Sequence, residues 1–208
     1  MTAVRRILPA GDRALLVELP HLDDVLALYD ALDGGRPAGV VDLVPASRTI
    51  GVTVDPAVLP LSVAHSWLAN TEPAAPAVAA EQRAVELRVR YDGPDLADVG
   101  ALLGLSPAEV VSLHTGSVWR VAFSGFAPGF GYLVTDHDRL TVPRRVTPRT
   151  MVPAGAVGLA GEFSGVYPRS SPGGWQLIGS TDAVLWDAAD ESPALLSPGT
   201  VVRFVEVS

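Results

Sequence analysis

The sequence contains neither cysteine nor lysine. Without cysteine the chain can form no disulfide, no thiolate metal site and no cysteine nucleophile, and this composition fits a reducing cytoplasm. All 15 basic residues are arginine, which excludes a Walker-type nucleotide loop, a Schiff-base lysine and a biotin-carrying lysine from this chain. The sequence therefore lacks the residues on which several self-sufficient enzyme classes depend.

Positive charge is also scarce, because 23 acidic residues outweigh the 15 arginines and leave a net charge of −8. This balance argues against nonspecific nucleic-acid binding, which requires positive charge to neutralise phosphates. Residues 1–16 lack the apolar run of a signal peptide, and the longest charge-free stretch, residues 56–71, is too short to span a bilayer. We expect a cytoplasmic protein that binds neither nucleic acid nor membrane.

Side chains that could bind a metal are few and dispersed. The histidines His21, His65, His114 and His137 match no recognisable metal-ligand spacing, and the Asp-His-Asp triplet at 136–138 is more typical of a polar turn. No serine lies in a G-x-S-x-G nucleophile elbow. We therefore expect no metal site in this chain.

Strand and helix patterns alternate in the first third of the chain, which predicts a small α+β domain over residues 1–70. A second helix is predicted to begin at Pro56, with Asp55 as its N-cap. The other predicted elements are strands at 5–9, 14–19, 40–44 and 49–54 and a helix whose apolar face covers residues 22–32.

A segment rich in alanine and proline, residues 71–82, has the composition of a linker and precedes a second domain, residues 83–208. Strand patterns are present at 84–91 and 200–207, and two short helical patterns follow the first of them, the second starting at a Ser106 capping box. From residue 117 onward, short apolar runs alternate with turn signals. This pattern predicts a mostly β, closed or nearly closed barrel.

Residues 125–174 contain 9 glycines and 6 prolines in 50 positions, well above an average combined share of about 12%. The same stretch carries several aromatic residues, which argues against disorder. Glycine allows a backbone to approach a ligand or partner closely, and proline restricts the path of the loop. We interpret the stretch as ordered functional loops, with purely structural turns as the alternative.

Positive charge gathers in the same region. Residues 114–175 contain six arginines and three acidic residues, a net charge of +3, and the rest of the chain, with nine arginines and 20 acidic residues, carries −11. Guanidinium groups bind carboxylate and phosphate through paired hydrogen bonds, so these arginines predict an anion site. Solvated or interface arginines are the alternative interpretation.

His114 and Asp92 are candidates for acid–base chemistry. His114 lies at the end of a helical pattern, where it could transfer protons or simply favour the negative end of the helix dipole. Asp92 and Asp95 flank Gly93-Pro94 and are typical turn residues. A carboxylate that faces the arginine loops would make a good general base, but the sequence does not place one.

Spaced glycines, prolines and aromatic residues resemble one known family. The resemblance is carried by Gly125-Phe126-x-Pro128-Gly129-Phe130-x-Tyr132-Leu133, Pro143-Arg144, Pro148-Arg149-Thr150, Val152-Pro153-Ala154-Gly155, Gly161, Tyr167-Pro168, Ser171-Pro172-Gly173-Gly174-Trp175, Gly179 and Thr181. These residues are similar to the family of B-type 5-oxoprolinase subunits, also described as allophanate hydrolase subunit 1 or carboxyltransferase subdomain C/D. The resemblance is dense over residues 91–181, whereas the N-terminal part agrees only in length and element order.

The resemblance implies an α+β N-terminal domain followed by a cyclophilin-like β-barrel. It also implies a complex with a sister subunit of type C, which has a related barrel, and with a third subunit. Together these would open 5-oxoproline to glutamate with hydrolysis of ATP. ATP, with magnesium as its counter-ion, is then the expected cofactor, and the chain alone is expected to be inactive.

On this resemblance, the loops are expected to bind substrate or ATP, with arginines clamping phosphate or carboxylate and glycines presenting backbone amides. The candidate catalytic residues are Arg144, Arg149, His114 and Asp92. The candidate binding residues are Gly125, Phe126, Pro128, Gly129, Arg144, Arg149, Pro153, Gly155, Tyr167, Pro172, Gly173, Gly174 and Trp175.

Two other functions are compatible with the resemblance. The family includes KipI-type inhibitors of a sporulation histidine kinase, so the aromatic loops could form a protein-binding surface. Related barrels also form the carboxyltransferase of biotin-dependent urea carboxylation, to which this chain could contribute only one part. The sequence departs from the family pattern at residues 134–137, where a glycine-containing turn is usual, and at Ala156, where serine is common.

Overall fold

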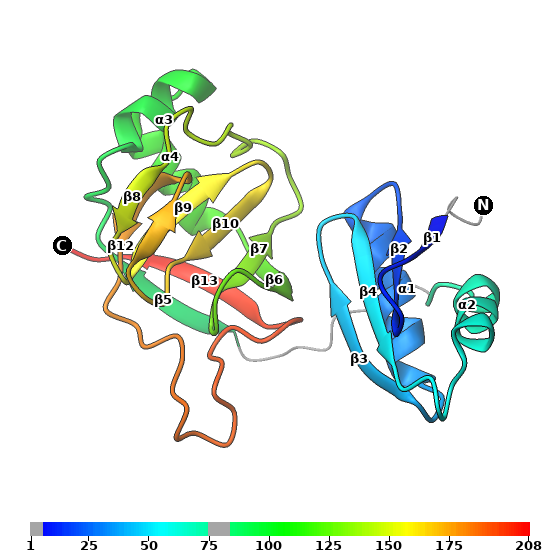
Figure 1. The fold of residues 1–208 in the computed structure, drawn as a ribbon. Helices are drawn as coiled ribbons and strands as arrows, with labels where there is room; N and C mark the ends of the chain where they lie inside the picture. The colour runs from blue at the N-terminus through cyan, green and yellow to red at the C-terminus, as the bar shows by residue number, and fades with distance from the viewer. Residues whose placement is uncertain (1–5, 75–83) are drawn as a thin grey trace. The chain divides into compact units, whose positions relative to one another are not determined.

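The computed structural model describes residues 6–74 and 84–208, and the chain divides into two compact units, Met1–Ala80 and Glu81–Ser208 (Figure 1). Most of the predicted linker, residues 71–82, lies outside the described residues, as does the first residue of the predicted strand at 5–9.

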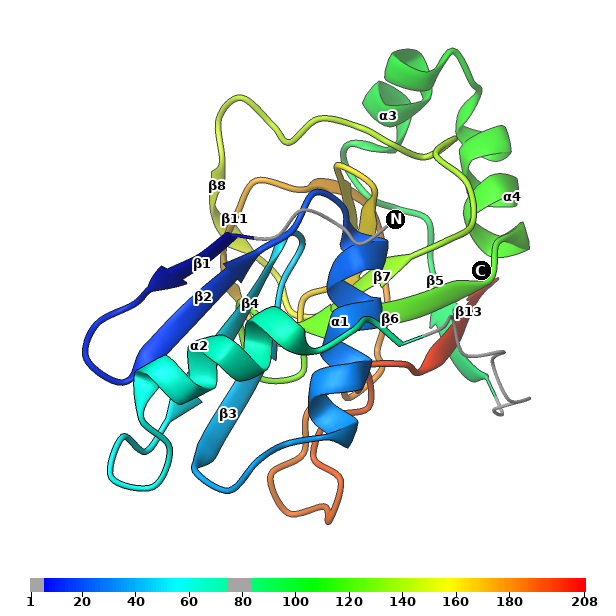
Figure 2. The ribbon, with the colours of Figure 1, turned by 90° about the vertical axis from the view of Figure 1, so that its right-hand side faces the viewer.

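The first unit contains a four-stranded antiparallel sheet with the strand order β1-β2-β4-β3. Both of its helices lie on one face of this sheet, α1 over β3 and β4 and α2 over β1 and β2 (Figure 2). The elements are β1 (Arg6–Pro9), β2 (Ala14–Glu18), α1 (Leu22–Gly34), β3 (Val40–Pro45), β4 (Thr49–Val54) and α2 (Leu61–Asn70).

Apolar periodicity explains this layering. Ile50, Val52 and Val54 of β4 are buried because alternate residues of a strand point to one face. Leu28 and Leu32 of α1 lie four residues apart, therefore share one side of the helix, and belong to the same hydrophobic cluster.

The second helix begins later than the sequence predicted. Asp55 does not cap a helix; its Oδ1 accepts a hydrogen bond of 3.0 Å from Ala57 N–H in a turn, and α2 begins at Leu61, after Pro60. A helix that started at Pro56 would place Pro60 in its interior, where proline lacks an N–H donor and clashes with the carbonyl four residues earlier. The prediction of an Asp55 N-cap was therefore wrong.

The second unit contains a seven-stranded mixed sheet, in the order β12-β9-β10-β7-β6-β13-β5, and a small sheet of β8 and β11. Its strands are β5 (Val85–Val89), β6 (Trp119–Ser124), β7 (Gly131–Val134), β8 (Arg149–Val152), β9 (Ala156–Ala160), β10 (Phe163–Val166), β11 (Ser171–Gly173), β12 (Gln176–Ser180) and β13 (Val201–Glu206). Strands β13 and β5 pair in parallel. The two edges of the large sheet meet where Arg90 and Ser180 exchange backbone hydrogen bonds of 2.9 and 2.8 Å. The sheet is thus a nearly closed barrel, as the sequence predicted.

Helices α3 (Leu96–Leu103) and α4 (Pro107–Gly116) follow β5 and carry the predicted end signals. Gly104 ends α3 with a φ of 69°, a left-handed conformation that costs glycine little. The Ser106 capping box is confirmed, because Ser106 Oγ accepts from Glu109 N–H and the Glu109 carboxylate accepts from Ser106 N–H. Across residues 6–74 and 84–208 no single helix is long and apolar enough to cross a membrane; α3 and α4 meet that criterion only as a pair, bent by 88°.

Candidate functional site

The glycine- and proline-rich stretch forms a group of loops around an aromatic core. We call residues 125–131, 143–149, 153–155 and 171–175 the loop cluster. The ring of Phe130 lies at its centre, with centroid distances of 5.3 Å to Phe126, 5.0 Å to Tyr132, 5.5 Å to Tyr167 and 5.3 Å to Trp175. All four contacts are edge-to-face, an arrangement that stabilises aromatic pairs beyond simple burial. The loops are therefore ordered by packing despite their glycine content.

Phe126 is the exception in this aromatic group, because 57% of it is exposed. It is also the one non-glycine residue of the described chain with a positive φ, at 65°. A left-handed backbone costs a residue with a Cβ roughly 1–2 kcal/mol. The fold thus holds a large apolar ring at the surface in an unfavourable backbone conformation, which is a feature typical of binding sites.

Close contacts require several glycines of the loop cluster, among them Gly155 and Gly173. Gly155 has a φ of 77°, and a Cβ at this position would collide with the Thr181 carbonyl oxygen; a Cβ at Gly173 would collide with the Tyr167 hydroxyl. The N–H of Gly155 donates a hydrogen bond of 2.7 Å to the Tyr167 carbonyl. This amide is therefore used by the fold and is not free to bind an anion.

A buried carboxylate joins residues 143–149, which we call the arginine loop, to the barrel. Asp95 is only 1% exposed, and its carboxylate accepts hydrogen bonds of 2.8 and 2.8 Å from Arg149 Nη1 and Nη2 and 2.6 Å from Arg145 Nη1. The carboxylate also accepts a hydrogen bond of 2.7 Å from the Leu177 N–H of β12. Burial alone would raise the pKa of Asp95, but these hydrogen bonds and the two positive charges hold that pKa below its ordinary value. Asp95 is therefore ionised and fully paired at neutral pH.

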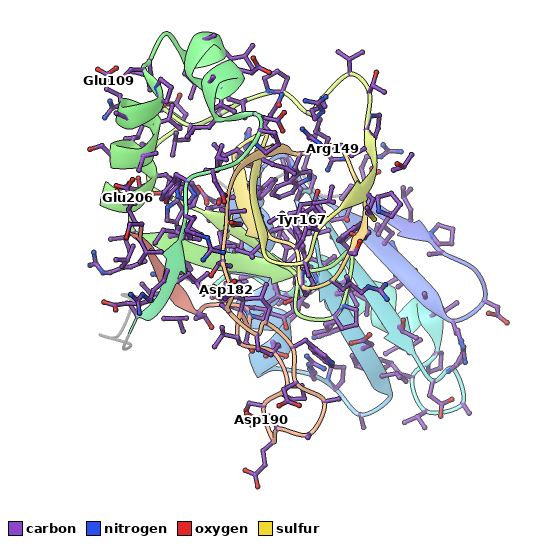
Figure 3. All side chains as sticks on the ribbon, turned by 90° about the vertical axis from the view of Figure 1, so that its left-hand side faces the viewer. Glu109, Arg149, Tyr167, Asp182, Asp190 and Glu206 are labelled. Carbon is purple, nitrogen blue, oxygen red and sulfur yellow. The ribbon has the colours of Figure 1, made fainter. Side chains whose placement is uncertain are left out.

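Arg144 is the arginine of this loop that stays exposed, and no hydrogen bond or ion pair joins it to another described residue. Its charge lies close enough to Tyr132 and Tyr167 to lower their pKa values, although burial has the larger effect and raises both. The two phenols therefore stay protonated at neutral pH and can donate hydrogen bonds. Figure 3 shows Arg149 and Tyr167 close together on the barrel, with Glu109 of α4 well apart from them.

His114 and Asp92, the other two catalytic candidates, are placed elsewhere. His114 is fully buried against the rings of Trp119 and Phe204, and its Nδ1 and Nε2 lie 2.8 Å from Tyr91 Oη and 2.9 Å from Ser164 Oγ. Burial lowers the pKa of His114 to about 3, so it is neutral and carries no charge toward the helix end. Asp92 is exposed and accepts a hydrogen bond of 2.9 Å from Ser180 Oγ.

The structure therefore brings together most of the predicted binding residues and divides the arginines into two groups. Of the candidates, Phe126, Arg144, Arg149, Tyr167, Gly173 and Trp175 meet around the aromatic core, and Gly125, Pro128, Gly129, Pro153, Gly155, Pro172 and Gly174 shape the same loops. Sequence reasoning missed Asp95, Arg145 and Tyr132. The sequence offered one indirect signal for Asp95, which is the local excess of arginine. An arginine that becomes buried on folding needs a carboxylate partner.

The loop cluster fits a phosphate or carboxylate better than a metal. Arg144 and the part-buried Tyr132 offer donors for anionic oxygens, whereas Asp95, the one carboxylate buried among the described residues, is occupied by two arginines. No group of three or more His, Asp or Glu side chains in the described chain is arranged to hold a metal ion. Magnesium that accompanies a nucleotide here would therefore need ligands other than Asp95.

Comparisons with known proteins show what the chain is similar to. The family model described as "Carboxyltransferase domain, subdomain C and D" matches residues 5–196. The chain is 44% identical over 173 residues to a protein from Escherichia coli O157:H7 that is named as the B-type subunit of 5-oxoprolinase, covering 80% of this chain and 78% of that protein. Among solved structures it resembles TTHA0988, with 37% identity and a TM-score of 0.77, over 94% of this chain and 40% of that one. The solved structure of the K. lactis urea amidolyase is 18% identical to this chain, with a TM-score of 0.76. The match covers 100% of this chain and 15% of that protein, and it shows only that the fold is shared.

Proposed function

Since the chain belongs to the carboxyltransferase domain, subdomain C and D family, and to the group of B-type 5-oxoprolinase subunits within it, we propose that it serves as the B-type component of an ATP-dependent 5-oxoprolinase. Such an enzyme opens 5-oxoproline to glutamate. The 44% identity to a relative of that name, over 80% of the chain, is the observation that carries the proposal.

The chemistry requires an activated amide, because a lactam carbonyl reacts slowly with water at neutral pH. ATP would supply the activation by transferring a phosphoryl group to the amide oxygen. Proteins promote such a transfer mainly by positioning and by donors aimed at developing negative charge. Arg144 of the loop cluster and the part-buried Tyr132 beside it can donate to an anionic oxygen, whereas Tyr167 is buried.

The two arginines predicted to form an anion clamp take different roles in this proposal. Arg149 holds Asp95 and thereby fixes the loop, together with Arg145. Arg144 keeps its guanidinium exposed for phosphate or carboxylate. The clamp is therefore reduced to one arginine that contacts the anion and one that positions its loop.

Exposed apolar side chains on the loop cluster and on the adjoining strand β8 support a role within a complex. Phe126 is 57%, Met151 71% and Val146 fully exposed. Apolar and aromatic side chains of this kind typically become buried at interfaces between subunits. We assign this surface to the sister subunit of type C, with a third subunit completing the enzyme. The partners would also supply the magnesium ligands, because Asp95 is occupied, and the chain alone would be inactive.

The proposal includes a cytoplasmic location and a cyclophilin-like type for the barrel, with residues 1–70 as a separate small domain. The exposed, strained Phe126 also suits a second candidate, a KipI-type inhibitor whose loops bind a histidine kinase. Such an inhibitor would need no ATP hydrolysis.

Co-expression with the sister subunit of type C and the third subunit, followed by an assay of 5-oxoproline-dependent ATP hydrolysis, tests the main proposal. The assembled complex should release glutamate and phosphate together, and the isolated chain should release neither. A complex that assembles correctly but does not hydrolyse ATP when 5-oxoproline is added would overturn the proposal.

A further inference from the structure

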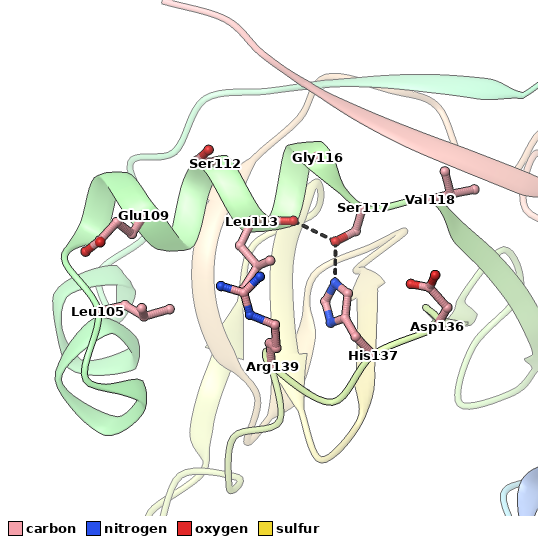
Figure 4. A pocket seen from close by; sticks show the side chains of 10 residues that line it. All are labelled: Leu105, Glu109, Ser112, Leu113, Gly116, Ser117, Val118, Asp136, His137 and Arg139. Carbon is pink, nitrogen blue, oxygen red and sulfur yellow. Dashed lines mark hydrogen bonds between the residues drawn. The ribbon is translucent and has the colours of Figure 1, made fainter.

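A cavity of about 550 Å³ lies between α4 and the segment that follows β7, as Figure 4 shows. Its volume is within the range of about 300–1,000 Å³ that is typical of small-molecule sites. The lining contains none of the residues of the loop cluster. The lining residues are Leu105, Glu109, Ser112, Leu113, Gly116, Ser117, Val118, Asp136, His137 and Arg139.

The cavity offers two charges of opposite sign that the fold leaves free. Within the described residues neither Asp136 nor Arg139 forms an ion pair, and Asp136 receives only a long hydrogen bond of 3.4 Å from Thr135 Oγ1. Glu109 is different, because its carboxylate accepts 2.8 and 2.7 Å hydrogen bonds from Ser106 N–H and Oγ. The free carboxylate and guanidinium are therefore Asp136 and Arg139.

The side of the cavity formed by the last turn of α4 favours a cation. Helix α4 ends at Gly116, and the C-terminal end of a helix carries partial negative charge, although Ser117 Oγ and Trp119 Nε1 donate here to two of its last carbonyls. Together with Asp136, this end suits an ammonium group, whereas Arg139 suits a carboxylate. The remaining lining includes the apolar side chains of Leu105, Leu113 and Val118.

His137 is held in one orientation at the cavity wall and lacks one hydrogen-bond partner. Ser117 Oγ donates its single proton to the Leu113 carbonyl at 2.6 Å, so the 2.8 Å bond between Ser117 Oγ and His137 Nε2 must be donated by His137. In a neutral ring, Nδ1 then carries a lone pair, and this buried atom has no partner among the described residues. Leaving a buried acceptor unpaired destabilises the folded chain. A ligand N–H that reached Nδ1 after a shift of neighbouring side chains would remove this cost.

We propose that this cavity binds a free α-amino acid with an aliphatic side chain. Its carboxylate pairs with Arg139, its ammonium group lies at Asp136 and the end of α4, and its side chain contacts the apolar lining. A zwitterion carries one group for each of the two free charges. The site is independent of the proposed oxoprolinase function, because it is separate from the loop cluster.

Isothermal titration calorimetry of the full chain with L-leucine tests the proposal. Two matched probes separate the charges: 4-methylpentanoate keeps the carboxylate and side chain without the ammonium group, and 3-methylbutylamine keeps the amine without the carboxylate. L-leucine should bind, and each probe should bind at least about tenfold more weakly, the change expected from about 1.4 kcal/mol. Equal binding of either probe, or no binding of L-leucine at about 10 mM, where a millimolar Kd would be evident, overturns the proposal.

Substitutions of the two charged lining residues test whether L-leucine binds in this cavity. Arg139→Ala and Asp136→Asn should each weaken L-leucine binding at least about tenfold, the loss expected for one charge-assisted contact. Arg203→Ala and Asp98→Asn are matched controls, because both residues are exposed and neither lines the cavity; they should bind as the parent does. Unchanged binding in both cavity variants would overturn the assignment. In NMR spectra of the parent chain, L-leucine should shift the signals of Ser117 and His137.

Discussion

Asp95 and Arg149 form a two-pronged ion pair, in which Arg149 Nη1 and Nη2 donate to the two carboxylate oxygens at 2.8 Å each. The pair connects the residue before α3 to the first residue of β8, 54 positions apart. Because Asp95 also binds Arg145 and the Leu177 N–H, one carboxylate holds the arginine loop against the barrel.

Replacement of Asp95 by alanine should strongly destabilise the second unit. The change leaves two partly buried guanidinium groups without a counter-charge, and breaking a buried pair in this way costs about 3 kcal/mol or more. Urea denaturation followed by tryptophan fluorescence would measure the loss. Asp182→Ala is the matched control: its pair with Arg90 is at the surface, and its loss should shift the midpoint far less. Equal effects of the two changes would contradict this explanation.

The contribution of Asp95 to the free energy of unfolding should depend on pH. Because its pKa is below the ordinary value of 3.8 in the folded chain, the stabilisation is complete above that value and is lost as the pH falls through the lower, folded pKa. The difference in unfolding free energy between the parent and Asp95→Asn should therefore be constant from neutral pH down to the ordinary pKa and shrink below it. If the difference in unfolding free energy already shrinks at neutral pH, the ionised Asp95 carboxylate is not the cause of the difference.

His114 should make the fold less stable in acid. Burial lowers its pKa from an ordinary 6.5 to about 3, so between these values the unfolded chain binds a proton that the folded chain does not. Stability should fall with decreasing pH in this window by at most about 1.4 kcal/mol per pH unit. His114→Gln should remove this slope and His65→Gln, at an exposed position, should keep it. The NMR signals of the His114 ring should not titrate between pH 8 and 5, and a titration there would contradict the burial of this ring.

Arg144 and Arg149 should respond differently to replacement by alanine. In the assembled complex, Arg144→Ala should lower kcat about 100-fold, as loss of a charged donor to a developing anion does, with the unfolding midpoint unchanged. Arg149→Ala should lower the midpoint, because it leaves Asp95 partly unpaired. Arg203→Ala should change neither quantity. Normal kcat in Arg144→Ala would remove Arg144 from the anion site.

The chain with glycine at position 126 should be more stable than the chain with alanine there. Both substitutions remove the ring, so the difference between them reports the left-handed φ of 65°. Phe126→Gly should be about 1 kcal/mol more stable than Phe126→Ala. The same pair of changes at Phe123, in β6, should give the opposite order, because glycine weakens a strand interior. Both Phe126 variants should also bind the sister subunit more weakly than the parent.

Local chemistry in the sequence was enough to predict several elements. The Ser106 capping box and Gly104 mark the ends of helices because their side-chain and backbone preferences act within a few residues. The start of α2 was mispredicted because Asp55-Pro56 and Pro60 give competing local signals, and only the second is compatible with a continuous helix.

Residue types alone determined that this chain has no thiol chemistry and no lysine chemistry, that its arginines gather with glycines and prolines, and that its second part is mostly β. Tertiary structure decided which arginine is free, because Asp95 is far from Arg145 and Arg149 in sequence and meets them only when β12 and the arginine loop pack together. It also decided that His114 is a neutral core residue and that Asp136 and His137 line a cavity. Burial and pairing arise from contacts between distant segments, and no local pattern specifies them.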